Sequence, residues 1–215
     1  MINWTTINTV LLDMDGTLLD LHFDNYFWQT YIPLKYAEKH RISLKQANTE
    51  LIPRFERVKG TLNWYCLDYW NNELKMDLVA MKEEVADKLN LRPSAEFFLK
   101  KLKAMGKQVF MITNAHPGSL SLKMHHLPIK DYFDRLISAH EYGVPKESPR
   151  FWSTLEADIH LRKDRALFID DGVHILDAAR QYGVAHLLAI RCPDSHQNPW
   201  DTGCYEAVED YRQLF

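Results

Sequence analysis

The stretch VLLDMDGTLL at Val10–Leu19 decides how the rest of the sequence is interpreted. Its apolar start predicts a buried strand over 9–13, and Asp13 and Asp15 stand where that strand ends. Gly16 allows the chain to turn sharply directly after the two carboxylates. Open α/β sheets bind their ligands at the carboxyl ends of the strands, so this stretch predicts an acidic site on such a sheet.

Further apolar runs predict more strands of the same sheet. Their residues are almost continuously apolar, as in a parallel sheet covered on both faces; they are Gln108–Thr113, Leu136–Ser138, Ala166–Asp170 and Ala185–Ile190. Helical patterns over 94–105 and 173–182 alternate with these strands, and a glycine ends each of them. The alternation predicts an α/β fold with a Rossmann-like parallel sheet.

One interval breaks this alternation. About 80 residues without a strand pattern separate the first strand from the helix at 94. Ser43-Leu-Lys-Gln46 has the form of a capping box, and Asp77 is the expected N-cap of a helix over 78–90. We therefore predict a core made of 1–19 and 91–215, with an α-helical cap over 20–90 inserted after the first strand. Aromatic residues are concentrated in this cap, where most should form its core and a few could face a cleft.

The overall composition excludes several classes of protein. The chain has 215 residues, 26 Lys and Arg against 29 Asp and Glu, and a formal net charge of −3, which argues against a nucleic-acid binder. Its three cysteines form no Cys-x-x-Cys pair, and no histidine pair has a convincing zinc spacing, so no disulfide framework or zinc knuckle is expected. No signal peptide and no apolar run of about 18 residues is present. We expect a cytoplasmic monomer with no membrane partner.

Polar side chains also follow the later predicted strands. Thr113-Asn114 closes the second strand, Lys146 follows the third, and Asp170-Asp171 closes the fourth. Taken singly, these residues have ordinary explanations: a turn, a solvated charge and a helix cap. Because they fall at the same edge of the sheet as Asp13, together they predict one site.

This combination of residue types suits the hydrolysis of a phosphate monoester. Asp13 can attack phosphorus as a nucleophile, and a divalent cation is needed to offset the repulsion between two anions. The carboxylates of Asp13, Asp170 and Asp171 are ligands of the kind that Mg²⁺ prefers. Asp15 is the natural general acid and base for the leaving alcohol and the attacking water.

Three further side chains supply the electrostatic complement of a bound phosphate. Lys146 adds a fixed positive charge, whereas the Thr113 hydroxyl and the Asn114 amide can donate hydrogen bonds to phosphoryl oxygens. These residues follow the second and third predicted strands, so the sequence predicts a phosphate-binding site there, beside Asp13 at the end of the first strand.

The four motifs together resemble those of the haloacid dehalogenase (HAD) superfamily. The matching residues are Asp13-x-Asp15-Gly-Thr, Thr113-Asn114, Lys146 with Pro149, and Asp170-Asp171. The resemblance implies a Rossmann-like core with a helical cap, Mg²⁺ dependence and a phosphoaspartate intermediate. It also implies that Asp13, the backbone carbonyl of Asp15, and Asp171 hold the metal, with Asp170 bound directly or through water.

A finer resemblance is to the bacterial GMP/IMP-type 5′-nucleotidases of this superfamily. It rests on short segments along the chain, namely Leu18–Trp28, Thr113–Pro117, Pro145–Ser148, Phe168–Asp171 and Asp210–Arg212. The commoner motif of the superfamily has Pro directly after the lysine, whereas Glu147 stands there in this chain. The resemblance implies a purine nucleoside monophosphate as substrate. Asn25, Trp28 and Trp64 are candidates for contact with the base, although each is also explained as part of the cap core.

Other functions remain open at this point. The site would also suit a HAD phosphatase of another small phosphomonoester, such as a sugar phosphate. A dehalogenase is disfavoured because a halide leaving group needs no general acid, which leaves Asp15 without a role. A non-catalytic phospho-acceptor module is a more remote alternative, because such modules carry the acceptor Asp later in the chain and have no helical cap.

Overall fold

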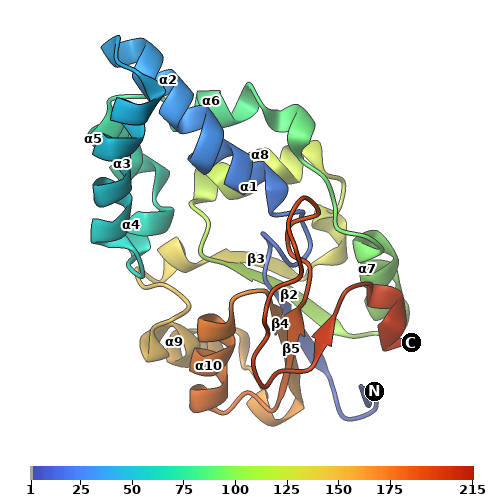
Figure 1. Ribbon diagram of the computed structural model, residues 1–215. Coiled ribbons are helices and arrows are strands. Elements are labelled where there is room, and N and C mark those ends of the chain that lie inside the picture. Colours follow the sequence, from blue (N-terminus) through green and yellow to red (C-terminus); the bar gives the residue numbers. More distant parts are fainter. Residues whose placement is uncertain (1) are drawn as a thin grey trace.

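The computed structural model describes residues 2–215. A six-stranded parallel sheet forms its centre, in the order β3-β2-β1-β4-β5-β6 (Figure 1). The strands are β1 (Thr9–Leu12), β2 (Gln108–Thr113), β3 (Arg135–Ser138), β4 (Ala166–Asp170), β5 (His186–Ile190) and β6 (Ala207–Val208). The predicted Rossmann-like α/β fold is confirmed, and the five predicted strands end within one residue of their observed bounds. The two-residue strand β6 is too short to give a periodic pattern, so the sequence did not predict it.

Helices cover both faces of the sheet. Val10 and Leu12 of β1 join one buried cluster with residues of α7 (Ala95–Ala104) and α8 (Pro117–His126). Leu11 points to the other face, where α9 (Pro149–Ile159) and α10 (Val173–Tyr182) form a second cluster. This burial on both faces explains why the strands are almost continuously apolar.

The order of the strands determines where polar groups meet. The chain adds β2 and β3 on one side of β1 and then continues with β4, β5 and β6 on the other side. Leu12 is in register with Met111 of β2 and with Ile169 of β4, so the residues that follow these strands emerge at one edge. The place where the strand order reverses, between β1 and β4, is the usual ligand site of open α/β sheets.

The helices of residues 20–90 lie above this edge of the sheet (Figure 1). We call them the helical cap; they are α1 (His22–Tyr26), a π-helical segment (Phe27–Tyr31), α2 (Ile32–His40), α3 (Leu44–Val58), α4 (Leu62–Tyr65), α5 (Leu67–Leu74) and α6 (Leu78–Glu83). The capping box of Ser43 and Gln46 and the N-cap at Asp77 are both present as predicted. The prediction of a helix over 78–90 was wrong about where this helix ends. Val85 leaves the helical region (φ −119°, ψ 16°), so α6 stops at Glu83 and a 3₁₀ turn over Ala86–Lys88 follows.

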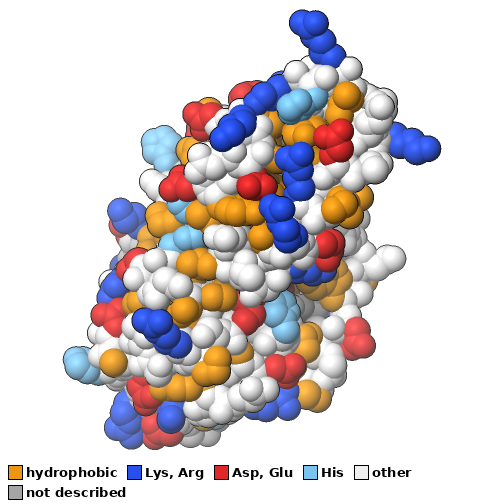
Figure 2. Space-filling view, turned by 90° about the vertical axis from the view of Figure 1, so that its left-hand side faces the viewer, with side chains coloured by type: hydrophobic (Ala, Val, Ile, Leu, Met, Phe, Trp, Pro, Cys, Tyr) orange, Lys and Arg blue, Asp and Glu red, His pale blue; other side chains and the backbone are white. Residues whose placement is uncertain are grey.

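The aromatic residues of the cap serve both purposes considered above. Phe23, Phe27 and Trp70 are buried in its core, whereas Trp28 and Trp64 are only partly buried. On the outer surface, acidic and basic side chains are interspersed over the face shown in Figure 2, in keeping with the small net charge. Within residues 2–215, no helix has both the length and the apolar character needed to cross a membrane.

Candidate active site

Carboxylates from two adjacent strands meet at the carboxyl edge of the sheet. Asp13 follows β1 and donates its backbone N–H to Ile169 of β4 (3.0 Å), whereas Asp170 is the last residue of β4 and Asp171 follows it. Carboxylate oxygens of Asp13, Asp170 and Asp171 lie within 4.8 Å of one another. The structure therefore brings together the three predicted side-chain ligands of a metal ion.

Gly16 is required by both its conformation and its surroundings. Its φ of +84° lies in the left-handed region, which side chains other than that of glycine rarely adopt. A Cβ at this position would lie 2.5 Å from Oδ2 of Asp171. The absence of a side chain at Gly16 thus allows the turn after Asp15 to approach the carboxylate cluster.

Lys146 lies buried inside the carboxylate cluster. Its Nζ donates a hydrogen bond to Asp13 and another to Asp170 Oδ2 at 2.7 Å. Burial by itself lowers the pKa of Lys146, but the negative charges of Asp13 and Asp170 outweigh this effect and hold the pKa above its ordinary value. The amine is therefore a permanent positive charge at the sheet edge.

One lysine does not balance three carboxylates. Burial raises the pKa of Asp13 to about 7 even though Lys146 opposes the shift, and Asp170 and Asp15 add to it. Burial together with the charges of Asp170 and Asp13 also raises the pKa of Asp171 well above its ordinary value. A hard divalent cation would offset this excess of buried negative charge, so the donor set fits Mg²⁺.

The residues after β2 organise the neighbouring loop. The Asn114 side chain accepts a hydrogen bond from the Lys146 backbone N–H (2.8 Å) and donates one to Glu147 Oε2 (2.9 Å). The Thr113 hydroxyl oxygen accepts a hydrogen bond from the Ala115 N–H at 3.0 Å. Both predicted phosphate-binding residues therefore lie at the site, but the Asn114 amide is already engaged in holding the Lys146 loop.

Asp15 belongs to a buried network of charges that links the core to the cap. Lys123 of α8 lies 2.6 Å from Asp15 and 2.5 Å from Asp24 of α1, and Lys82 of α6 lies 2.6 Å from the other oxygen of Asp24. Burial raises the pKa of Asp15 more than Lys123 lowers it. For Asp24 the balance is reversed, because Lys123 and Lys82 outweigh burial and hold its pKa below the ordinary value.

The sequence did not predict a role in the site for Lys123, Asp24 or Lys82. Asp24 lies within the Leu18–Trp28 segment quoted above, but no motif assigns a role to it or to either lysine. The signal that the sequence offered was the position of the two lysines among apolar residues. In the structure, Lys82 and Lys123 are almost completely buried. Buried lysines are rare unless they are paired with acids.

Glu147 is a second link between the cap and the core. Its carboxylate accepts a hydrogen bond from the Tyr65 hydroxyl of α4 (2.9 Å) and lies 3.6 Å from Nε2 of His174. Burial tends to raise the pKa of Glu147, but hydrogen bonds from His174, Asn114 and Tyr65 lower it to about 2. The residue that departs from the commoner HAD motif thus joins the lysine loop to the cap.

A cavity of about 420 Å³ lies between the cap and the carboxylate cluster. This volume is within the range of sites for small ligands. Its polar floor includes Asp13, Asp15 and Lys146, and its cap side includes the three predicted specificity residues Asn25, Trp28 and Trp64. The Asn25 amide donates a hydrogen bond to Asp194 at 2.6 Å, so this side chain is already paired.

Comparison with known proteins agrees with the fold. The chain belongs to the haloacid dehalogenase-like hydrolases, since the model of that family matches residues 7–183, and it is therefore an enzyme of the hydrolase class. It is 43% identical over 213 residues to the GMP/IMP nucleotidase YrfG of Escherichia coli, covering 99% of this chain and 96% of that protein.

More distant matches also cover most of the chain. The (S)-2-haloacid dehalogenase 2 of Pseudomonas sp. is 24% identical over 193 residues, covering 82% of this chain and 81% of that protein. The crystal structure of a HAD phosphatase from Thermococcus onnurineus superposes with a TM-score of 0.79 at 19% identity, covering 97% of this chain and 96% of that one.

Proposed function

We propose that this protein is a Mg²⁺-dependent 5′-nucleotidase that releases phosphate from a purine nucleoside monophosphate such as GMP or IMP. The observation that carries the proposal is the carboxylate cluster of Asp13, Asp170 and Asp171 around Lys146, at the floor of a cavity whose other wall is aromatic. The 43% identity to a GMP/IMP nucleotidase over nearly the whole chain supports the choice of substrate.

The fit of the donor set leads us to assign the metal to named residues. Asp13, the backbone carbonyl of Asp15, and Asp171 would hold Mg²⁺, with Asp170 bound directly or through water. When bound, the ion neutralises the phosphate and allows an anionic nucleophile to approach it. Lys146 also contributes positive charge to the phosphate site, because its buried amine stays charged between Asp13 and Asp170.

Asp13 acts as the nucleophile in this mechanism. An oxygen of its carboxylate bonds to phosphorus while the bond from phosphorus to the 5′ oxygen breaks, giving a phosphoaspartate and the nucleoside. Lys146 contacts the Asp13 carboxylate and so fixes its orientation before the attack. Thr113 and the loop held by Asn114 lie beside the transferred group and orient it.

Asp15 handles the protons of both half-reactions. Burial raises its pKa, which favours the protonated form needed to give a proton to the departing 5′ oxygen. The carboxylate that results then removes a proton from the water that hydrolyses the phosphoaspartate. Lys123, 2.6 Å away, holds the Asp15 side chain in place through both steps.

The aromatic wall of the cavity provides a surface for a flat base. Trp28 and Trp64 line it on the cap side, and the rings of both lie edge-on to Phe55, at 5.9 and 6.4 Å between centroids. Stacking of a purine on such rings is tolerant of the exact base and favours the larger ring system. We therefore assign recognition of the base to Trp28 and Trp64, with Asn25 close by.

The test is the release of phosphate from a panel of substrates with Mg²⁺ present. GMP and IMP should be hydrolysed faster than pyrimidine nucleotides and faster than ribose 5-phosphate, which has no base. Removal of the metal with EDTA should stop the reaction, and added Mg²⁺ should restore it. Equal rates on nucleotides and sugar phosphates would favour a general phosphatase and contradict the purine assignment, whereas an unchanged rate in EDTA would contradict the metal.

A further inference from the structure

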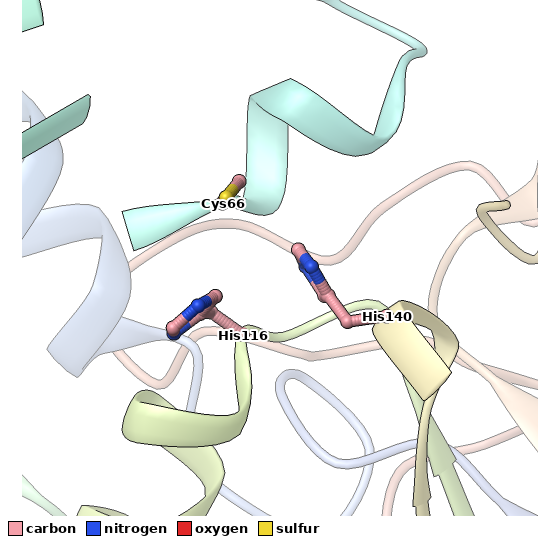
Figure 3. A group of neighbouring side chains, drawn as sticks. All are labelled: Cys66, His116 and His140. Carbon is pink, nitrogen blue, oxygen red and sulfur yellow. The ribbon is translucent and has the colours of Figure 1, made fainter. Parts of the chain in front are cut away.

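A second group of metal-binding side chains lies at the junction of the cap and the core. Cys66 stands between α4 and α5 in the cap, His116 precedes α8, and His140 lies in a 3₁₀ turn (Ala139–Glu141) after β3. One ligand atom from each of the three lies within 4.8 Å of the other two. Figure 3 shows Cys66 on one side of a small gap, facing the two imidazole rings on the other side.

His140 carries a buried polar atom whose hydrogen-bonding capacity is not satisfied by the residues that the structure describes. Its Nε2 is buried from solvent and has no hydrogen-bond partner within the described residues. A buried polar atom without a partner is uncommon in native proteins and costs free energy. The ring of His116 lies edge-on to the ring of His140, with the centroids 5.1 Å apart. A metal ion between the three side chains would satisfy this nitrogen.

The other two side chains are positioned to join it. Cys66 Sγ accepts a hydrogen bond from the Tyr69 N–H (3.4 Å) at the start of α5, which fixes the orientation of the Cys66 side chain. His116 accepts a hydrogen bond at Nδ1 from the Gly118 N–H (3.2 Å), and its Nε2 lies 3.4 Å from Asp68. A metal ion at this ring would replace one of these two weak contacts, and the Asp68 carboxylate beside His116 is a candidate fourth ligand.

The ligand types determine which ion would bind. One thiolate and two imidazoles suit a borderline ion such as Zn²⁺, whereas Mg²⁺ takes oxygen ligands. In a tetrahedral zinc site with bonds of about 2.0–2.3 Å, ligand atoms lie roughly 3.3–3.8 Å apart. The three ligand atoms lie within 4.8 Å of one another, so they would have to close by at most about 1.5 Å to bind such an ion. Since Cys66 belongs to the cap and the histidines to the core, such a contraction would hold the cap against the core.

We propose that Cys66, His116 and His140 form a binding site for a Zn²⁺-type ion that clamps the helical cap to the core. The site is separate from the carboxylate cluster and does not depend on the identity of the substrate. Its ligands are 50 and 24 residues apart in the sequence, which is why no short spacing motif revealed it.

Titration of the metal-free full-length protein with Co²⁺, in a large excess of Mg²⁺ to occupy the carboxylates, tests this proposal. Cobalt bound by a thiolate gives a charge-transfer absorption in the near ultraviolet, which binding to carboxylates alone does not give. The wild type should develop this band and saturate at one equivalent. Cys66→Ser should remove the band, and His140→Ala should weaken binding by at least about tenfold, in line with the loss of one ligand.

The matched control is Cys204→Ser, which changes an exposed cysteine outside the cluster and should leave the band unchanged. As a second readout, Zn²⁺ should raise the unfolding temperature of the wild type and of Cys204→Ser but not that of Cys66→Ser, whose folding is checked without metal. Absence of the band in the wild type, or its persistence in Cys66→Ser, would overturn the proposal.

Discussion

Replacement of Lys123 by Met tests whether the buried charge network supports both folding and catalysis. In the native network two buried lysines balance Asp15 and Asp24, and the substitution leaves one lysine for two partly buried carboxylates. Asp24 keeps Lys82 at 2.6 Å, but Asp15 loses the lysine bound to it. Removal of one partner from a buried ion pair costs about 3–5 kcal/mol, a large share of the roughly 5–15 kcal/mol that stabilises a typical domain.

The loss should appear in denaturant unfolding of Lys123→Met compared with the wild type. The matched control is Lys100→Met, because Lys100 contacts Glu96 at 2.7 Å on the exposed surface, where water screens the pair and no measurable loss is expected. The double variant Lys123→Met/Asp15→Asn removes one charge of each sign, so it should regain much of the stability lost in the single variant.

Activity gives an independent readout of the same substitution. Without Lys123 the pKa of Asp15 should rise further and its side chain should lose its fixed position. General acid–base catalysis typically accelerates a reaction by about 10²–10⁴-fold. With Asp15 misplaced, the rate of phosphate release should therefore fall by about tenfold or more. Lys82→Met, which leaves the contact between Asp15 and Lys123 intact, should reduce the rate less. A free energy of unfolding for Lys123→Met that lies within about 1 kcal/mol of the wild-type value would refute the reasoning.

Three further substitutions test the site. Gly16→Ala places a Cβ 2.5 Å from Asp171 Oδ2 and should raise the Mg²⁺ concentration for half-maximal activity at least about tenfold; Gly106→Ala, at φ +64° with nothing near its Cβ, should not, and equal Mg²⁺ requirements would contradict the clash. Tyr65→Phe removes the hydroxyl that donates to Glu147, so KM should rise a few-fold with the fold intact; an unchanged KM would separate this contact from substrate binding. The pKa of Glu147 is lowered to about 2 from 4.5, so its stabilisation is complete above pH 4.5 and is lost as the pH falls toward 2. Stability measured against pH should therefore be flatter in that window for Glu147→Gln, and identical slopes would argue against the assigned pKa.

The core of the fold could be predicted from the sequence because the patterns that indicate its strands and helices are local. The strand carrying Asp13 is a continuous apolar run, and the glycines after two helices mark where those helices end. Parallel strands bring residues after different runs to one edge, so the meeting of Asp13, Lys146 and Asp170 followed from the order of the motifs.

The contacts between the cap and the core could not be predicted from such local sequence patterns. The contacts of Asp15 with Lys123, of Glu147 with Tyr65, and of Cys66 with the two histidines join residues that are far apart in the sequence and belong to no repeat or spacing rule. Their formation depends on how the cap helices lie over the sheet, which is a matter of tertiary packing. The early end of α6 was missed because the N-cap at Asp77 is marked in the sequence, whereas no glycine or proline marks the break at Val85.

The most direct test of the account is the initial rate of phosphate release from GMP, with Mg²⁺ present, for the wild type and for Asp13→Asn. The substitution is nearly isosteric and removes one charge from a crowded carboxylate cluster, so the variant should fold. Loss of the nucleophile should lower the rate by at least about a thousandfold. A folded Asp13→Asn variant that retains a rate within tenfold of the wild type, or a wild type that releases no phosphate from GMP, would contradict the account.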